Sequence, residues 1–380
     1  MKNACPFLIR LFCYIQFSEK IYGGVILMKS QIRNEESINR KLYNSLIRKR
    51  LILIVLLLLS LAFLVILNIS IGSSSIPVKE ILRVLFTGKG EGHNPMIIMD
   101  IRLPMALMAV VVGASLGIGG CEIQTILRNP IASPFTLGIS AAASFGAAVG
   151  LVLNANLFHV SDTLMVTVNT FAFSLLAAVG VYTFSHQKGI GKTAIILFGI
   201  ALNFLFSALT MILQYVADED ELQSLIFWNF GSLLKTTWIK FFIVLTVLVI
   251  SYCIMFKDAW KLTAMTLDDT KARSLGVDTT KVRRKVIFVT SLLSSVAVCF
   301  VGTIGFVGLI APHIARQLVG EDQRFFMPLS ALIGAFIMSF AFVVSKTIIK
   351  GVILPIGLIT ALIGIPFFIT IIFSKMRRMQ

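Results

Sequence analysis

The residue types that carry most protein chemistry are few and scattered in this chain. The five cysteines stand at positions 5, 13, 121, 253 and 299, without the C-x-x-C spacing of metal or redox sites. The four histidines have no partner at helical ligand spacing, and no H-E-x-x-H, G-x-S-x-G or P-loop pattern occurs. We therefore expect no catalytic residue, no metal site and no bound cofactor in this chain. An intramembrane enzyme is disfavoured for the same reason.

Two ionisable residues inside apolar stretches need a separate interpretation. His313 follows Pro312, and we expect it to satisfy backbone groups that the proline leaves unpaired rather than to bind a metal. Glu122 is the clearest ionisable residue within the apolar segments. Ion-driven carriers usually place such residues in their spans as relays. Their scarcity disfavours a carrier, and an ATP-independent channel or ion-driven carrier is kept as an alternative.

The elements that would position these residues are those of a membrane protein. Of 380 residues, 57% are apolar and only 14% are charged, and the mean hydropathy is +0.91. A water-soluble core of this length cannot bury so much apolar surface. Because about 20 apolar residues cross the hydrocarbon layer as a helix, the sequence predicts an all-α polytopic membrane protein. Its ten expected spans are residues 51–70, 103–126, 134–153, 161–185, 193–216, 238–256, 283–302, 306–319, 327–347 and 355–374.

The net charge of +16 predicts topology rather than nucleic-acid binding. Basic residues gather in the segments 29–50, 257–285 and 375–378, between apolar spans rather than on one amphipathic face. The positive-inside rule places all three segments in the cytoplasm. We therefore expect both termini inside and the acidic run 218–221 outside, in a multi-pass protein of the bacterial cytoplasmic (inner) membrane.

The N-terminal region predicts a basic cytoplasmic tail over residues 1–50, followed by a single membrane domain over 51–376. Residues 1–27 fit this scheme poorly, because Arg10 interrupts their only apolar run and no small-residue cleavage site follows it. Met28 then opens the basic segment. Our hypothesis is that residues 1–27 are a dispensable extension.

Glycine and proline break the apolar segments at fixed points. Small residues between Gly113 and Gly120 predict close helix packing, which we favour over direct substrate contact. Prolines remove a backbone donor and restrict the preceding residue, so they predict helix breaks. The break and packing positions are Gly113, Pro130, Gly305, Gly308, Pro312, Pro355, Gly357 and Pro366.

The longest hydrophilic segment between spans runs over residues 257–285. Asp268 and Asp269 suit the first turn of a short helix, Lys271 and Arg273 follow them, and Gly276 suits its end. The pattern leaves two interpretations open: a solvated loop, or helices over about 258–281 that dock a cytoplasmic partner.

Several motifs, in order, resemble a known family. They cover about residues 50–375 and include Ile101–Pro104, Leu127–Pro130, Leu197–Asn203, Phe227–Leu233, Ala272–Val277, Gly305–His313 and Pro355–Phe368. Together they are similar to the permeases of the iron-siderophore, haem and vitamin B12 branch of bacterial ATP-binding-cassette importers, the type II importers. This resemblance implies a fold with ten spans and a subunit that supplies the route but no catalysis.

The resemblance also implies partners and their sites. Two permease subunits, identical or paralogous, would form the pathway, and a cytoplasmic ATPase dimer that binds ATP and Mg²⁺ would dock on them. An extracytoplasmic binding protein would deliver the cargo to basic residues matching Arg102 and Lys346. Met105 and Ile353 depart from the family pattern near these positions. The coupling role falls on Ala272, Arg273, Ser274, Leu275 and Gly276.

The expected cargo is an iron chelate, with a ferric siderophore favoured by the family and haem or cobalamin left open. Because a whole chelate moves, the family does not need a cluster of metal ligands. Asn203, Ser207 and Gln214, at near-helical spacing in the fifth expected span, are the candidates for lining the pathway.

Overall fold

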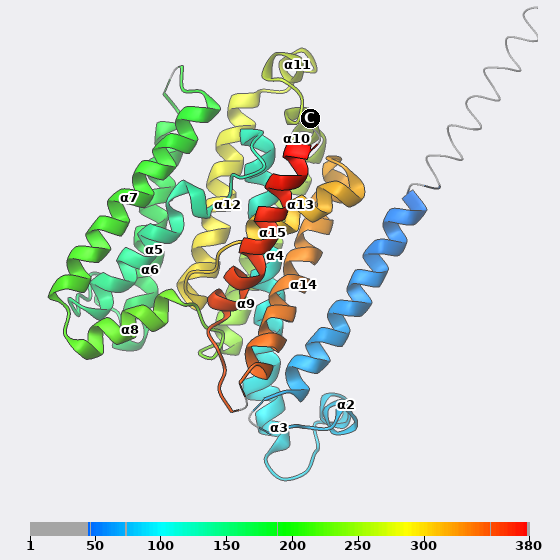
Figure 1. Cartoon of the computed structure of the whole chain (residues 1–380), viewed down its shortest axis with the longest axis vertical. Coiled ribbons are helices and arrows are strands. Elements are labelled where there is room, and N and C mark those ends of the chain that lie inside the picture. Colours follow the sequence, from blue (N-terminus) through cyan, green and yellow to red (C-terminus); the bar gives the residue numbers. More distant parts are fainter. Residues whose placement is uncertain (1–44, 46, 73, 188, 350, 378–380) are drawn as a thin grey trace, which may run out of the picture. The chain divides into compact units, whose positions relative to one another are not determined.

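The computed structural model describes residues 45, 47–72, 74–187, 189–349 and 351–377, and every regular element in these ranges is a helix (Figure 1). The chain divides into two compact units, Met1–Val55 and Leu56–Gln380. The second unit contains the elements described below. The proposed extension, residues 1–27, lies outside the described residues.

The helices that follow the first span range from 3 to 25 residues in length. They are α2 (Val78–Thr87), α3 (Asn94–Met96), π-helix η1 (Ile97–Arg102), α4 (Leu103–Leu127), 3₁₀-helix η2 (Phe135–Leu137), α5 (Ile139–Leu151), α6 (Asp162–Phe184), α7 (Lys192–Val216), α8 (Glu219–Asn229), α9 (Trp238–Phe256), α10 (Ala259–Met265), α11 (Asp269–Ser274), α12 (Thr279–Val301), α13 (Val307–Val319), α14 (Gln323–Thr347) and α15 (Ile356–Arg377).

The expected all-α, polytopic membrane architecture is confirmed. By length and composition, seven helices in the described ranges can cross a membrane: Ile47–Ser70, Asn94–Leu127, Leu164–Phe184, Lys192–Val216, Trp238–Phe256, Thr279–Val301 and Gln323–Thr347.

Three expected spans correspond to shorter apolar or partly apolar helices. Helices α5 and α13 have 13 residues each, or about 20 Å at 1.5 Å per residue, less than the hydrocarbon thickness of about 30 Å. The apolar part of α15 is Ile356–Thr370. The expected spans are too long because they are drawn from runs of apolar residues. Such runs do not show where the backbone leaves the helical conformation, as it does at Gly138 with φ +84°.

Helix α4 forms the centre of the bundle. It packs against α9, α12, α13 and α14 (Figure 1), and every residue from Val111 to Leu127 is buried. A helix that is apolar on all sides belongs in the interior, and the sequence of α4 fits that rule. A second group, α5 with α6 and α7, contacts the central group through α12.

Glycines allow the backbones of α4 and its neighbours to touch. A Cβ atom at Gly113 would lie 2.8 Å from the Cα of Ala335 in α14, and one at Gly120 would lie 2.9 Å from the Cα of Gly308 in α13. Helix association in lipid depends on such close packing, since lipid tails are as apolar as the side chains. The run that begins at Gly113 therefore packs helices together.

We expect Gly120→Ala to destabilise the protein. Alanine in a helix is normally favoured over glycine by about 1 kcal/mol, but overpacking costs about 1–3 kcal/mol, and the new methyl group would collide with the backbone of Gly308. Thermal unfolding in one detergent measures the change.

Gly180→Ala in α6 is the matched control, because a Cβ there meets only a Phe198 ring carbon at 4.0 Å. The control is expected to melt at or above the wild-type temperature. A Gly120→Ala protein as stable as the control would contradict the packing argument.

Candidate functional site

The hydrophilic segment between α9 and α12 is ordered as two short helices, α10 and α11. Asp268 occupies the N-cap position of α11, and Asp269 lies in its first turn. Gly276 follows the helix with φ +82°, a left-handed conformation that glycine adopts without steric cost. The segment is therefore helical rather than an irregular loop, and its docking of a cytoplasmic partner stays a prediction.

Ion pairs fix α11 to three membrane helices. The Asp269 carboxylate lies 2.6 Å from the Lys192 ammonium at the start of α7 and 2.8 Å from the Arg283 guanidinium in α12. Asp268 lies 2.9 Å from Arg128, the residue that ends α4. The ends of α4, α7 and α12 are therefore tied together through α11.

Burial and the neighbouring cations shift the pKa of Asp269 in opposite directions. Burial raises the pKa of Asp269, but the hydrogen bonds and charges of Lys192 and Arg283 outweigh it, and the net pKa lies below the usual value. A lowered pKa in the folded state favours folding above the usual Asp range near pH 4. This contribution is lost as the pH falls through the lowered pKa.

The expected coupling residues divide into an anchored side and an exposed side. Ala272 is fully buried, whereas Leu275 is 50% exposed, and Arg273, Ser274 and Gly276 are also exposed. The Arg273 Nε donates to the Thr279 hydroxyl at 3.3 Å. The segment thus exposes one apolar side chain, Leu275, among polar ones. The helix that carries it is held in place by its ion pairs with the membrane helices.

Arg102 is buried and Lys346 is half-buried against the end of the first span. The Arg102 guanidinium donates to the carbonyl oxygens of Ile69, Ser70 and Ser74 at 2.6–3.1 Å. The Lys346 ammonium donates to the Asn68 carbonyl at 2.8 Å. Both side chains satisfy carbonyl groups that a helix leaves unpaired at its C-terminus. Their expected docking role stays a prediction.

The candidate pathway residues Asn203, Ser207 and Gln214 lie half-buried on α7. The Asn203 amide donates to the carbonyl oxygens of Phe135 and Thr136 at 3.2 and 3.3 Å, so it fixes η2 against α7. Their role in lining a pathway stays a prediction.

Most of the glycine and proline positions fall at helix ends or helix contacts, but two of the expected helix breaks, Pro312 and Pro366, do not occur, because both helices continue through the proline. Pro130 lies in the turn after α4, Gly305 precedes α13, and Pro355 directly precedes α15. Pro312 and Pro366 lie inside α13 and α15. In α13, Gly308 packs against α4, and in α15 Gly357 packs against the backbone of residue 230.

His313 has a side-chain partner on its own helix. Its Nε2 lies 2.9 Å from the Gln317 amide nitrogen, one turn further along α13. Its expected role in satisfying backbone groups beside Pro312 stays a prediction. The described residues contain no group of three or more His, Cys, Asp or Glu side chains arranged to hold a metal ion.

A buried polar network lies near the end of α4. Glu122 is fully buried, and the Cys121 thiol lies 3.8 Å from its carboxylate and 3.7 Å from the Gln323 side-chain oxygen. The Gln323 amide donates to the Thr125 hydroxyl at 2.8 Å, and the Arg316 guanidinium donates to the Gln124 oxygen at 3.1 Å. Hydropathy identified Glu122 but not this network, since its members come from three separate helices.

The fold and the anchored helix pair define a multi-pass membrane permease of the ABC transporter class. The chain belongs to the FecCD transport family, whose model matches residues 57–374. The family resemblance seen in the sequence motifs is thereby confirmed.

Relatives and a solved structure extend over nearly the whole chain. A protein of Methanocaldococcus jannaschii described as an ABC transporter permease is 35% identical over 345 residues, 89% of this chain and 98% of the relative. The molybdate import permease MolB of Haemophilus influenzae is 32% identical, covering 84% and 95%. The hemin transport permease HmuU of Yersinia pestis is 32% identical, covering 83% and 96%.

The solved structure is described as an inward-facing, metal-chelate type ABC transporter. It has a TM-score of 0.74 and 30% identity, and the match covers 85% of this chain and 99% of that chain. The shared fold includes the membrane bundle described above.

We expect Asp269→Asn to loosen α11. The ion pairs of Asp269 are neither fully exposed nor fully buried. We therefore expect their loss to reduce the free energy that holds α11 in place by about 1–3 kcal/mol. This corresponds to roughly 5- to 150-fold faster amide exchange if α11 opens locally. Hydrogen–deuterium exchange of peptides covering α10 and α11 measures the effect at neutral pH.

Asp268→Asn is the control, because its ion pair with Arg128 is largely exposed and such pairs contribute about 1 kcal/mol or less. Equal exchange in the two variants would show that Asp269 does not anchor the helix.

Proposed function

We propose that this chain is the membrane subunit of an importer that moves an iron chelate across the bacterial cytoplasmic membrane, with ATP hydrolysed by a separate protein. The observation that carries the proposal is the anchored pair α10–α11, which exposes Leu275 while Asp269 ties it to α7 and α12. Membership of the family, the hemin permease and the metal-chelate transporter support an iron chelate as cargo, and a ferric siderophore is the chelate that we propose.

The ATPase partner is proposed to dock on α10–α11, at Ala272, Arg273, Ser274, Leu275 and Gly276. ATP and Mg²⁺ are bound by that partner. Since Arg128, Lys192 and Arg283 link α11 to the ends of three helices, a displacement of α11 by the closing ATPases would move those ends together. In this way ATP binding changes which side of the membrane the pathway faces.

A second permease subunit is proposed to complete the pathway. Helix α7 exposes large apolar side chains along one face, at Leu197, Phe204, Met211 and Tyr215, and the last is 90% exposed. Spacings of seven and four residues keep these side chains on one face. A second copy or a paralogue would cover that face, next to the half-buried Asn203, Ser207 and Gln214.

The orientation is proposed from charge. The segment 257–285 carries eight Lys and Arg residues and lies at the end where α11 is anchored. The positive-inside rule assigns this end to the cytoplasm, which agrees with an ATPase docked there. Both termini would then also lie inside.

The extracytoplasmic binding protein is proposed to dock at the opposite end, near Arg102 and Lys346. Because both cations bind carbonyl groups at the end of the first span, they would act by fixing the shape and charge of that surface. Rim charges of this kind set orientation and association rate more than affinity.

We expect Leu275→Glu to abolish recovery of the ATPase. A buried apolar contact at the centre of an interface is worth about 2 kcal/mol or more, so co-purification in mild detergent should fall at least about tenfold. Leu157→Glu is the matched control, since Leu157 is also 50% exposed but lies in the connection between α5 and α6.

The monodispersity of both variants is checked by gel filtration. Retention of the ATPase by Leu275→Glu, with normal folding of the variant, would contradict the docking site.

The cargo is tested in proteoliposomes that contain this subunit with its ATPase and binding protein. We expect ATP-dependent uptake of a ⁵⁵Fe-labelled siderophore in preference to hemin and cobalamin. Preference for molybdate, the cargo named for a relative, would replace the iron chelate with an oxyanion. Uptake without ATP would favour the channel or carrier alternative.

A further inference from the structure

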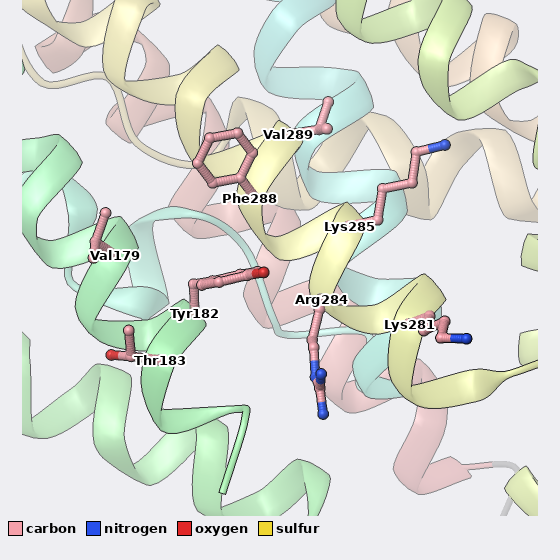
Figure 2. Close-up of a pocket in the computed structure, with 8 residues that line it drawn as sticks. All are labelled: Val179, Tyr182, Thr183, Lys281, Arg284, Lys285, Phe288 and Val289. Carbon is pink, nitrogen blue, oxygen red and sulfur yellow. The ribbon is translucent and has the colours of Figure 1, made fainter.

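A pocket of about 530 Å³ lies between the last turns of α6 and the first turns of α12 (Figure 2). Both helices are long enough to cross the membrane, and the pocket lies near the end at which Arg283 binds Asp269 in α11. The eight lining residues are Val179, Tyr182, Thr183, Lys281, Arg284, Lys285, Phe288 and Val289.

The lining has a polar part and an apolar part along the helix axes. Arg284 and Tyr182 lie toward the helix ends, whereas Phe288 and Val179 lie one turn deeper in the spans. Phe288 and Val179 are each 41% exposed. Apolar side chains exposed at the depth of a membrane span face lipid chains, while the polar part lies at the level of lipid headgroups.

Most cations around the pocket are already paired. Lys285 lies 2.6 Å from Asp258 and Lys281 lies 3.3 Å from Asp278. Figure 2 accordingly shows the Lys285 ammonium on the side of α12 away from α6. These two lysines line the pocket and add positive charge near it, but their ammonium groups are already engaged in ion pairs.

Arg284 is the exception. Its Nε is buried and has no hydrogen-bond partner, and no ion pair is formed by its guanidinium within the described part of the chain. A buried donor without a partner costs about 1–3 kcal/mol, and more when the group is charged. The Tyr182 hydroxyl points from α6 toward α12 (Figure 2), so a second donor faces the same space.

We infer that this pocket binds an anionic phospholipid, with its phosphate on Arg284 and Tyr182 and an acyl chain against Phe288 and Val179. A guanidinium matches the geometry of a phosphate, to which it can donate two hydrogen bonds. Basic pockets between membrane helices at the cytoplasmic face are a general form of lipid headgroup site. A soluble phosphate would satisfy the guanidinium but would leave the apolar part of the pocket empty.

The inference goes beyond the proposed transport function and does not depend on the cargo. A lipid held between α6 and α12 would brace the contact between the α5–α7 group and the central bundle. Its binding is therefore measured directly, without a transport assay.

The test uses the full chain in detergent, with native mass spectrometry and thermal unfolding in the presence of phosphatidylglycerol, phosphatidylcholine or inorganic phosphate. We expect phosphatidylglycerol to bind and raise the melting temperature more than phosphatidylcholine. Arg284→Gln should weaken phosphatidylglycerol binding about five- to tenfold, the effect of about 1–1.4 kcal/mol. Arg284→Lys should retain part of it.

Two further variants make the result specific. Lys257→Gln removes an exposed cation at the same end of the bundle, outside the pocket, and should change binding less than twofold. Val179→Trp fills the apolar part without altering charge and should also displace the lipid, so the test does not depend on the folding of an Arg284 variant.

Three outcomes would overturn the inference. Equal weakening by Lys257→Gln would indicate diffuse attraction to basic surface, and protection by inorganic phosphate equal to that by phosphatidylglycerol would indicate a free-anion site. Unchanged binding in Val179→Trp would place the lipid elsewhere.

Discussion

The structure depends on the close approach of α4 to α13 and α14. In a membrane the lipid tails compete equally for apolar side chains, so only tight van der Waals packing distinguishes the helix contact from lipid contact. Glycine at positions 113, 120, 308 and 334 removes the side chains that would separate these backbones. The burial of α4 from Val111 to Leu127 follows from these contacts, and the remaining helices take their positions around it.

In the proposed mechanism, the ion pairs of α11 can transmit movement because the helices at the centre of the bundle are tightly packed. Asp269 binds cations from α7 and α12, and Asp268 binds the cation that ends α4. Because α4 is packed against the central helices, a force on α11 reaches the bundle as a shift of whole helix ends rather than as a local loop movement. The exposed Leu275 provides the surface on which a partner would apply that force.

Basic residues serve three distinct purposes in one chain with a net charge of +16. Lys192 and Arg283 form the ion pairs of α11. Arg102 and Lys346 satisfy carbonyl groups at the end of the first span. Arg284 retains an unpaired buried nitrogen, and an anionic lipid is the ligand that its surroundings favour.

The sequence by itself determined the membrane class, the long spans and the short helix that begins at Asp269, because hydropathy and capping are properties of neighbouring residues. Only the tertiary structure decided that Gly113 meets α14, that Arg128, Lys192 and Arg283 converge on α11, and that Arg102 is buried. These contacts join residues far apart in the chain. Their choice depends on how whole helices pack, which no local pattern records.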